Sequence, residues 1–212
     1  MVGALRILWH ISLAARPTFF CEPIAVGVKV TTQAPGICTR MPPKLSMATV
    51  PKYSYAVPTK GARLLVKDVT ERLQSSADTE TKRSIEKYLK VVQSRGNKVP
   101  AIKAAAAATL KDVSDIQPCD IYSAAFLLLL SKMTDDKYAG LMFLSQKLIL
   151  NGAIYEPPNL GLRDRLLDDV SALFDTVVVN NWSECDGLCG HVIGPFVARH
   201  PYRRQVADTV LG

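Results

Sequence analysis

Long apolar runs, paired cysteines and β-strand patterns are scarce in this sequence of 212 residues. No stretch has the roughly 18 uninterrupted apolar residues that a membrane-spanning helix needs, so we expect no membrane partner. The five cysteines are an odd and scattered set, which is untypical of a secreted disulfide framework and favours a reducing, intracellular compartment. No segment shows a strong two-residue alternation of apolar and polar side chains. These absences favour a helical protein of the cell interior.

Acidic residues are almost missing from the N-terminal 60 residues. This part holds seven of the 26 basic residues and seven of the 13 prolines, but its only acid is Glu22. Such a segment cannot bury enough periodic apolar surface to offset the entropy of ordering it. We interpret residues 1–60 as a disordered or transit-peptide-like extension, with a signal-peptide core at Ile7–Ala15 or a start at Met41 or Met47 as alternatives. The compartments considered are the nucleus, a mitochondrion or a plastid.

The net charge of +7 therefore arises mainly in the extension, and the remaining residues are close to neutral. Nucleic-acid binding then has to rest on local basic patches. The first patch spans residues 82–111, where Glu86 is the only acid, and a lysine-rich helix of this kind is by default a solvated face. The first patch consists of Lys82, Arg83, Lys87, Lys90, Arg95, Lys98, Lys103 and Lys111, and the second of Arg199, His200, Arg203 and Arg204.

From residue 61 onward, apolar residues recur at helical spacing. A first helix is predicted near residues 64–73, and Asp78 precedes a second helix that ends at Arg95-Gly96. Pro100 opens a third helix. A fourth follows Pro118, and its apolar segment Ile121–Leu130 is too short to span a bilayer, so it is predicted to be a buried core helix.

The second half of the chain continues this pattern. Thr134-Asp135-Asp136 predicts the start of a helix that runs through Leu150, and Pro157-Pro158 separates it from a helix over Leu160–Val179. A last helical segment begins near Asn181. Helix pairs recur at about 40 residues, which is the HEAT-type period. We therefore predict an all-α, HEAT-like helical-repeat solenoid, an ARM-type superhelix, over residues 61–212, with a helical bundle as the alternative.

Trp182 and Asp186 are the most informative pair of residues. They lie four positions apart and therefore share one face of a helix. Glycines at 187, 190 and 194 each weaken a helix by about 1 kcal/mol relative to alanine, but leave room for a neighbouring helix or a ligand backbone. The alternative is an ordinary packed aromatic beside a solvated acid.

These residues resemble a pattern of the AlkD-type DNA alkylation repair enzymes, the HEAT-like-repeat alkylpurine DNA glycosylases. Trp182 and Asp186 match the family's Trp-x-x-x-Asp, and Gly194 follows as in the family. Upstream, Tyr88 and the stretch from Gly96 to Pro100 resemble the family's tyrosine-bearing helix and its Gly-x-x-x-Pro link. The resemblance covers roughly residues 61–212.

The resemblance implies hydrolysis of the N-glycosidic bond of N3- or N7-alkylated purines in duplex DNA, with no cofactor. Such a base is cationic and departs neutral, so the positive charge that develops on the deoxyribose is what needs stabilising. Asp186 would supply the carboxylate, and Trp182 would pack against the sugar and exclude water. Contacts to DNA are expected from Tyr88, Lys87, Lys90, Arg95, Lys98, Lys103, Arg203 and Arg204.

Other functions stay open at this point. A non-catalytic HEAT-like scaffold that binds DNA or protein is the main alternative, and a module that dimerises through its apolar helix is another. Cys185 and Cys189 share a helical face, but His191 points elsewhere and a fourth ligand is missing, so we predict no metal site.

The family fold also continues through further helical pairs, which supply an arginine and a second tryptophan. The only other tryptophan here is Trp9, in the extension. The resemblance therefore implies that C-terminal repeats are missing or that a partner chain covers the last helix.

Overall fold

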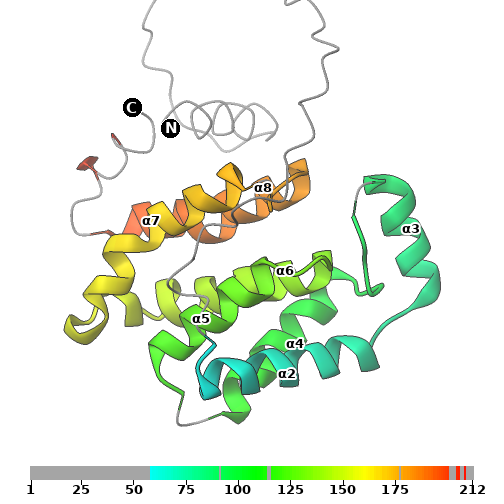
Figure 1. Cartoon of the computed structure of the whole chain (residues 1–212), viewed down its shortest axis with the longest axis horizontal. Helices are drawn as coiled ribbons and strands as arrows, with labels where there is room; N and C mark the ends of the chain where they lie inside the picture. Colours follow the sequence, from blue (N-terminus) through cyan, green and yellow to red (C-terminus); the bar gives the residue numbers. More distant parts are fainter. Residues whose placement is uncertain are drawn as a thin grey trace, which may run out of the picture.

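The computed structural model describes residues 58–90, 92–113, 116–176 and 178–200, together with residues 204, 205 and 208. The predicted extension over residues 1–60 lies almost wholly outside this part. The described residues form helices and no strand, and one isolated parallel bridge joins Gln93 to Met133 (Figure 1). The predicted all-α fold is confirmed.

Two of the helical rods change their winding without a break. α6 continues directly into the π-helix η1, and α8 continues through the π-helix η4 into α9. The elements in chain order are α2 (Lys60–Ser75), α3 (Thr79–Leu89), α4 (Val99–Asp112), α5 (Pro118–Leu129), α6 (Thr134–Met142), η1 (Phe143–Leu150), the 3-10 turns η2 (Ala153–Tyr155) and η3 (Pro157–Asn159), α7 (Leu160–Asp175), α8 (Trp182–Leu188), η4 (Cys189–Ile193) and α9 (Gly194–Arg199).

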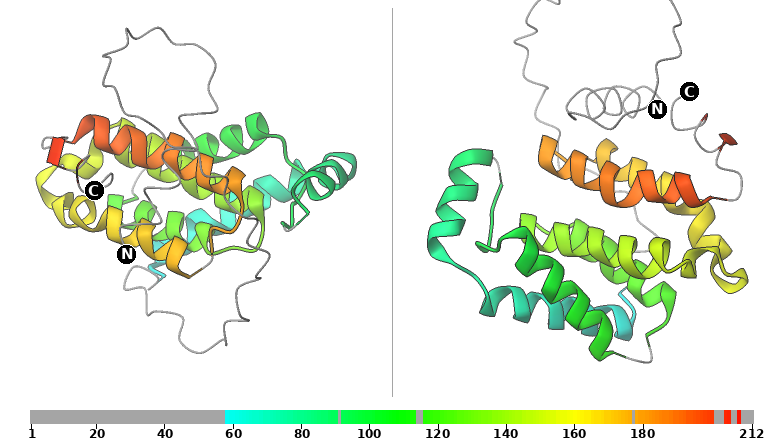
Figure 2. Two further views of the ribbon diagram at one scale, coloured as in Figure 1. Left: turned by 90° about the horizontal axis from the view of Figure 1, so that it is seen from above. Right: turned by 180° about the vertical axis from the view of Figure 1, so that it is seen from behind.

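The helices form two layers. α2 packs on α5, whereas α4, α6 and α8 pack in series to form the layer seen from behind in Figure 2. Neighbouring helices of the two layers pack against each other in pairs, as α5 does with α6. α5 begins at Pro118 and α7 at Leu160, so these two pairs start 42 residues apart, close to the predicted period. This is the side-by-side stacking of a helical-repeat fold.

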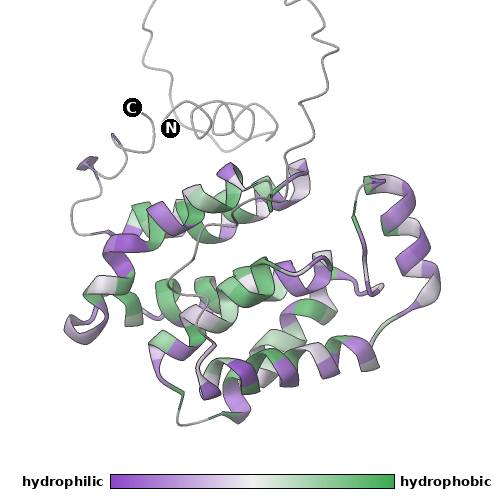
Figure 3. Cartoon of the chain, in the orientation of Figure 1, coloured by the Kyte–Doolittle hydropathy of each residue, from purple (hydrophilic) through white to green (hydrophobic). Residues whose placement is uncertain are grey.

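The apolar core lies between the layers, and α5 is its centre. Phe126, Leu128 and Leu129 of this helix are buried, which confirms the prediction of a core helix (Figure 3). The buried hydroxyl of Tyr122 donates to Asp169 at 2.6 Å and so joins α5 to α7. A buried phenol needs such a partner, because an unpaired polar group in the core is costly.

The predicted end of the second helix is wrong. α3 ends at Leu89, where Lys90 adopts a positive φ of 54°, and an extended link follows instead of a helix through Arg95-Gly96. The backbone N–H groups of Arg95 and Asn97 both donate to the carboxylate of Asp135 on α6, at 2.8 Å. These bonds to another helix hold the link in an extended conformation. α3 has no buried residue and stands apart from the two layers (Figure 1).

The helix predicted over Leu160–Val179 is also shorter than expected. α7 ends at Asp175, and the N–H groups of Val178 and Val179 both donate to the carbonyl of Leu173, at 3.1 and 3.2 Å. The carbonyl of Val178 accepts a bond from the Lys137 ammonium at 2.7 Å. Tertiary contacts therefore override the helical pattern of these valines.

Gly96 is a position at which the fold requires glycine. Its φ is 98°, and a Cβ there would lie 2.1 Å from the carbonyl oxygen of Asp78. We expect Gly96→Ala to lower the free energy of unfolding by about 3 kcal/mol in urea denaturation. Gly152 is the control, because its φ is 83° but nothing lies within 4 Å of its Cβ position. Gly152→Ala should cost only about 1 kcal/mol, and equal losses in both variants would contradict this account.

Candidate functional site

Tyr88 and Trp182 meet at the surface, although they are far apart in the sequence. Their ring centroids are 6.0 Å apart and their planes lie at 84°, an edge-to-face contact. The side chains remain 73% and 58% exposed. Two large aromatic rings paired in solvent are not core residues, so the alternative of an ordinary packed tryptophan does not describe Trp182. Such an exposed pair is a surface on which a ligand can stack.

Asp186 lies one turn after Trp182 on α8 and is exposed. The residues from Trp182 to Leu188 are α-helical, so the indole and the carboxylate project from the same side of this helix. The opposite side is buried against α6, where a Cβ on Gly187 would lie 2.8 Å from Leu141. Gly190 instead faces open space. The sequence predicted that these glycines make room for a neighbouring helix or for a ligand backbone. Gly187 makes room for a neighbouring helix.

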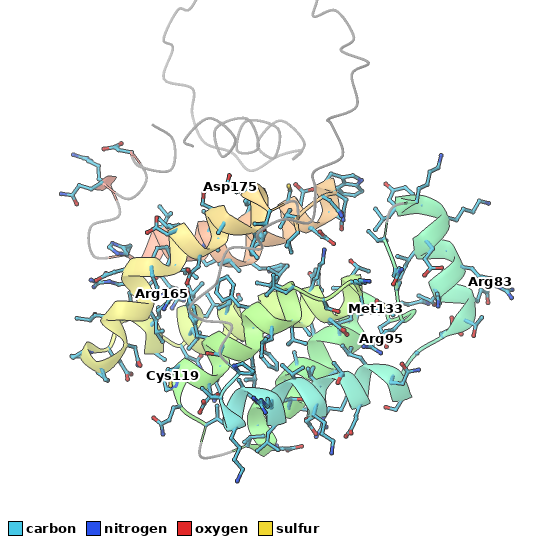
Figure 4. All side chains as sticks on the ribbon, viewed as in Figure 1. Arg83, Arg95, Cys119, Met133, Arg165 and Asp175 are labelled. Atoms are coloured by element: carbon cyan, nitrogen blue, oxygen red, sulfur yellow. The ribbon has the colours of Figure 1, made fainter. Side chains whose placement is uncertain are left out.

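Four predicted DNA-binding lysines are exposed: Lys87, Lys90, Lys98 and Lys103. Within the described part of the chain, none of them forms an ion pair. Arg83 of the same patch points away from the body of the molecule (Figure 4). The single acid of the patch, Glu86, turns toward the link and accepts the N–H of Ser94 at 3.1 Å. Glu86 is therefore not paired with the lysines of the patch.

Arg95 has other partners than the predicted phosphate. Its guanidinium donates to both carboxylate oxygens of Asp136, at 2.8 and 3.0 Å, and to Gln74 at 2.9 Å (Figure 4). The hydrogen bond with Asp136 is the largest of the effects that raise the pKa of Arg95. This side chain joins α2 to α6, and we leave it out of the interface considered below. Arg204 is exposed, and Arg203 lies outside the described residues.

The first turn of α6 holds the link that follows Tyr88. The helix begins at Thr134 as the sequence predicted, with Met133 as its N-cap and no side-chain cap. Asp135 is instead fully buried and accepts three bonds of 2.8 Å, from the Ser94 hydroxyl and from the N–H groups of Arg95 and Asn97. A buried carboxylate is tolerated because its lone pairs are satisfied in this way.

Lys137, two residues after Asp135, binds the first turn of α8. Its ammonium contacts both carboxylate oxygens of Glu184, at 2.9 and 3.0 Å, and both side chains are buried. Asn181 caps the same helix, with its side-chain oxygen accepting the N–H of Glu184 at 3.1 Å. Sequence reasoning missed Lys137 and Glu184, because nothing in a local pattern distinguishes a buried ion pair from two solvated charges.

A polar pocket of about 290 Å³ is lined by the segments that follow α3, α5 and α7 and by residues of α6 and α8. Lys137 and Glu184 contribute to its lining, together with Val92, Gln93, Leu130, Ser131, Lys132, Val178 and Asn180. The described part of the chain contains no cluster of three or more His, Cys, Asp or Glu residues arranged to hold a metal. Nor does any helix in that part have the length and apolar character to cross a membrane.

The thiols and the imidazole of the last rod face inward. Burial is the main cause that raises the pKa of Cys185 to about 11, and it also raises the pKa of Cys189. His191 shares a hydrogen bond of 2.8 Å with the hydroxyl of Tyr138, and burial lowers the pKa of its imidazole. Because the thiolate is the nucleophilic form, a thiol of this kind is a poor nucleophile at neutral pH.

The fold and the site together define a helical-repeat protein that presents an exposed aromatic pair, a nearby carboxylate and unpaired lysines. A family model described as DNA alkylation repair enzyme matches residues 69–211, and the chain belongs to this family. No curated protein and no solved structure matches the chain.

Cys185 provides a test of the burial of the last rod. At pH 8 its thiol should be almost fully protonated, so iodoacetamide should modify it slowly, and the rate should rise as the pH approaches 11. The exposed Cys119 is the internal comparison and should be modified first. Peptide mapping by mass spectrometry after timed alkylation measures both rates. Equal rates at pH 8 would contradict the burial of Cys185.

Proposed function

We propose that this protein is a DNA glycosylase that hydrolyses the N-glycosidic bond of N3- or N7-alkylated purines in duplex DNA. The observation that carries the proposal is the exposed Tyr88–Trp182 pair with Asp186 one helical turn away. Membership of a DNA alkylation repair family supports it, and the paired helices support HEAT-type repeats. The aromatic edges and the carboxylate are the groups that such a reaction uses.

The chemistry requires little from a general acid. An alkylated purine already carries a positive charge and leaves as a neutral base, so positive charge builds up on the deoxyribose ring as the bond breaks. The carboxylate of Asp186 stabilises that charge and orients the attacking water. It is exposed in the free protein, so the DNA itself excludes solvent from it and strengthens the electrostatic interaction. The rings of Tyr88 and Trp182 pack against the sugar and the lesion.

The lysines would position the duplex. Lys87 and Lys90 flank Tyr88 at the end of α3. Lys98 lies just before α4, and Lys103 lies on it. Contacts of this type neutralise phosphates and carry no sequence information. Arg204 is exposed near the C-terminal end and is proposed as an additional contact. Alkylated duplex DNA is therefore the proposed partner.

Replacement of Asp186 tests the catalytic role. Asp186→Asn keeps the size of the side chain but removes its charge, so we expect the rate of base release from methylated duplex DNA to fall roughly tenfold to a hundredfold. DNA affinity should fall much less. Asp175→Asn is the matched control, because Asp175 is an exposed acid at the end of α7 and its loss changes the net charge equally. Release of alkylated base is measured by chromatography.

Unchanged base release by Asp186→Asn would reject the catalytic assignment. If the parent protein releases no base and binds intact and methylated duplexes equally, the protein is instead a non-catalytic scaffold.

Replacement of lysines tests the interface. Each phosphate contact contributes about −0.9 to the slope of log affinity against log salt concentration. We therefore expect Lys87→Gln and Lys90→Gln each to reduce the slope by about 0.9, measured by fluorescence anisotropy with a labelled duplex. Lys67→Gln is the control, because Lys67 is an exposed lysine on α2 and not on α3. An equal reduction by Lys67→Gln would mean that binding follows total charge, not this surface.

A further inference from the structure

We infer that Lys137, acting through Glu184, is a positioning residue that sets the contact between Trp182 and Tyr88 independently of the stability of the fold. For its effect on catalysis the inference rests on the function proposed above. Lys137 does not touch the proposed reaction site itself, because its side chain is buried and points between α6 and α8.

The ammonium of Lys137 binds the chain on both sides of Trp182. It donates to the carbonyl of Val178 at 2.7 Å, before the tryptophan, and to the two carboxylate oxygens of Glu184 at 2.9 and 3.0 Å, after it. These three acceptors match the three donors of an ammonium group. Glu184 in turn accepts the N–H of Asn180 at 3.4 Å. One buried charge therefore fixes the turn from which the indole projects.

The other aromatic ring is held from the same turn of α6. Asp135, two residues before Lys137, binds the link that follows Tyr88. α3 buries none of its residues, so this link is its main attachment to the layers, together with the bond from the Asp78 N–H to the Gly96 carbonyl at 3.2 Å. The first turn of α6 thus binds the segments that carry both rings, Tyr88 through Asp135 and Trp182 through Lys137. A change at Lys137 therefore moves the Trp182 ring relative to the Tyr88 ring.

A buried ion pair need not contribute to the stability of a fold. Replacing a buried ion pair by apolar residues of similar volume is often neutral or stabilising, whereas removing one partner leaves an unpaired buried charge. Methionine and leucine would fill the space of Lys137 and Glu184. They cannot bind the Val178 carbonyl or the Asn180 N–H, however. The double variant Lys137→Met/Glu184→Leu therefore separates positioning from stability.

The test follows the environment of the Trp182 ring directly. With Trp9 replaced by phenylalanine, 5-fluorotryptophan reports from position 182 alone in 19F NMR. We expect the resonance of Lys137→Met/Glu184→Leu to move to the position seen in Tyr88→Leu, which lacks the ring contact. The urea midpoint should stay close to that of the parent. Base release should fall by on the order of a hundredfold, since small displacements far from the chemistry have effects of this size.

Two further variants complete the experiment. Lys67→Met/Glu71→Leu makes the same replacements at an exposed pair, whose atoms are 3.8 Å apart, and should change neither the resonance nor base release. Glu184→Gln keeps an acceptor for Lys137 but removes its counter-charge, so the urea midpoint should fall while the resonance stays at the position of the parent. If the first double variant does not fold, the charge-swapped Lys137→Glu/Glu184→Lys replaces it, because it keeps the pair but removes the donor from the Val178 carbonyl.

The outcomes distinguish this inference from the proposed function. A resonance that stays at the parent position in a folded double variant overturns the positioning role, whatever the activity. A displaced resonance in a protein that shows no base release even in its parent form supports the positioning role and rejects the glycosylase. A displaced resonance with full base release shows that the ring contact is not needed for the reaction and overturns the catalytic consequence.

Discussion

Three consecutive buried charges at the start of α6 organise this molecule. Asp135, Asp136 and Lys137 each lie in the interior, where a charge is tolerated only with a partner. Their partners lie on other elements: the link before α4 for Asp135 and Asp136, and the start of α8 for Lys137. Satisfying these charges forces both links out of helical conformation. The same contacts place the end of α3 beside the start of α8.

This arrangement explains why the aromatic pair is exposed. α8 buries the side that carries Glu184 and Gly187 and leaves Trp182 outside, whereas α3 buries nothing and reaches the pair only through its end. Rings held in this way are ordered before a ligand arrives, so less conformational entropy is lost on binding. A surface of this kind suits stacking on a broad partner such as a duplex, which fits the proposed function.

The distribution of charge follows the same logic. The chain beyond residue 60 is close to neutral overall, yet the acid within the first basic patch and two acids of α6 bind groups of the protein itself. Glu86 binds the Ser94 N–H, and Asp135 and Asp136 bind the link and Arg95. The lysines of α3 stay in solvent. A neutral domain therefore acquires a locally positive surface next to the aromatic pair, which is the condition for phosphate contacts that steer a duplex without broad basicity.

The sequence alone determined the helical class, the core helix at residues 118–129, and the shared face of Trp182 and Asp186, because these depend on periodicity within a single element. Tyr88 on the second helix was singled out by the resemblance to the family. Only the tertiary structure decided that Tyr88 touches Trp182, that Arg95 is bound to Asp136, and that α3 and α7 end early. Each of these depends on a charge buried against a distant segment. Such partners are chosen by packing in three dimensions, which no local spacing encodes.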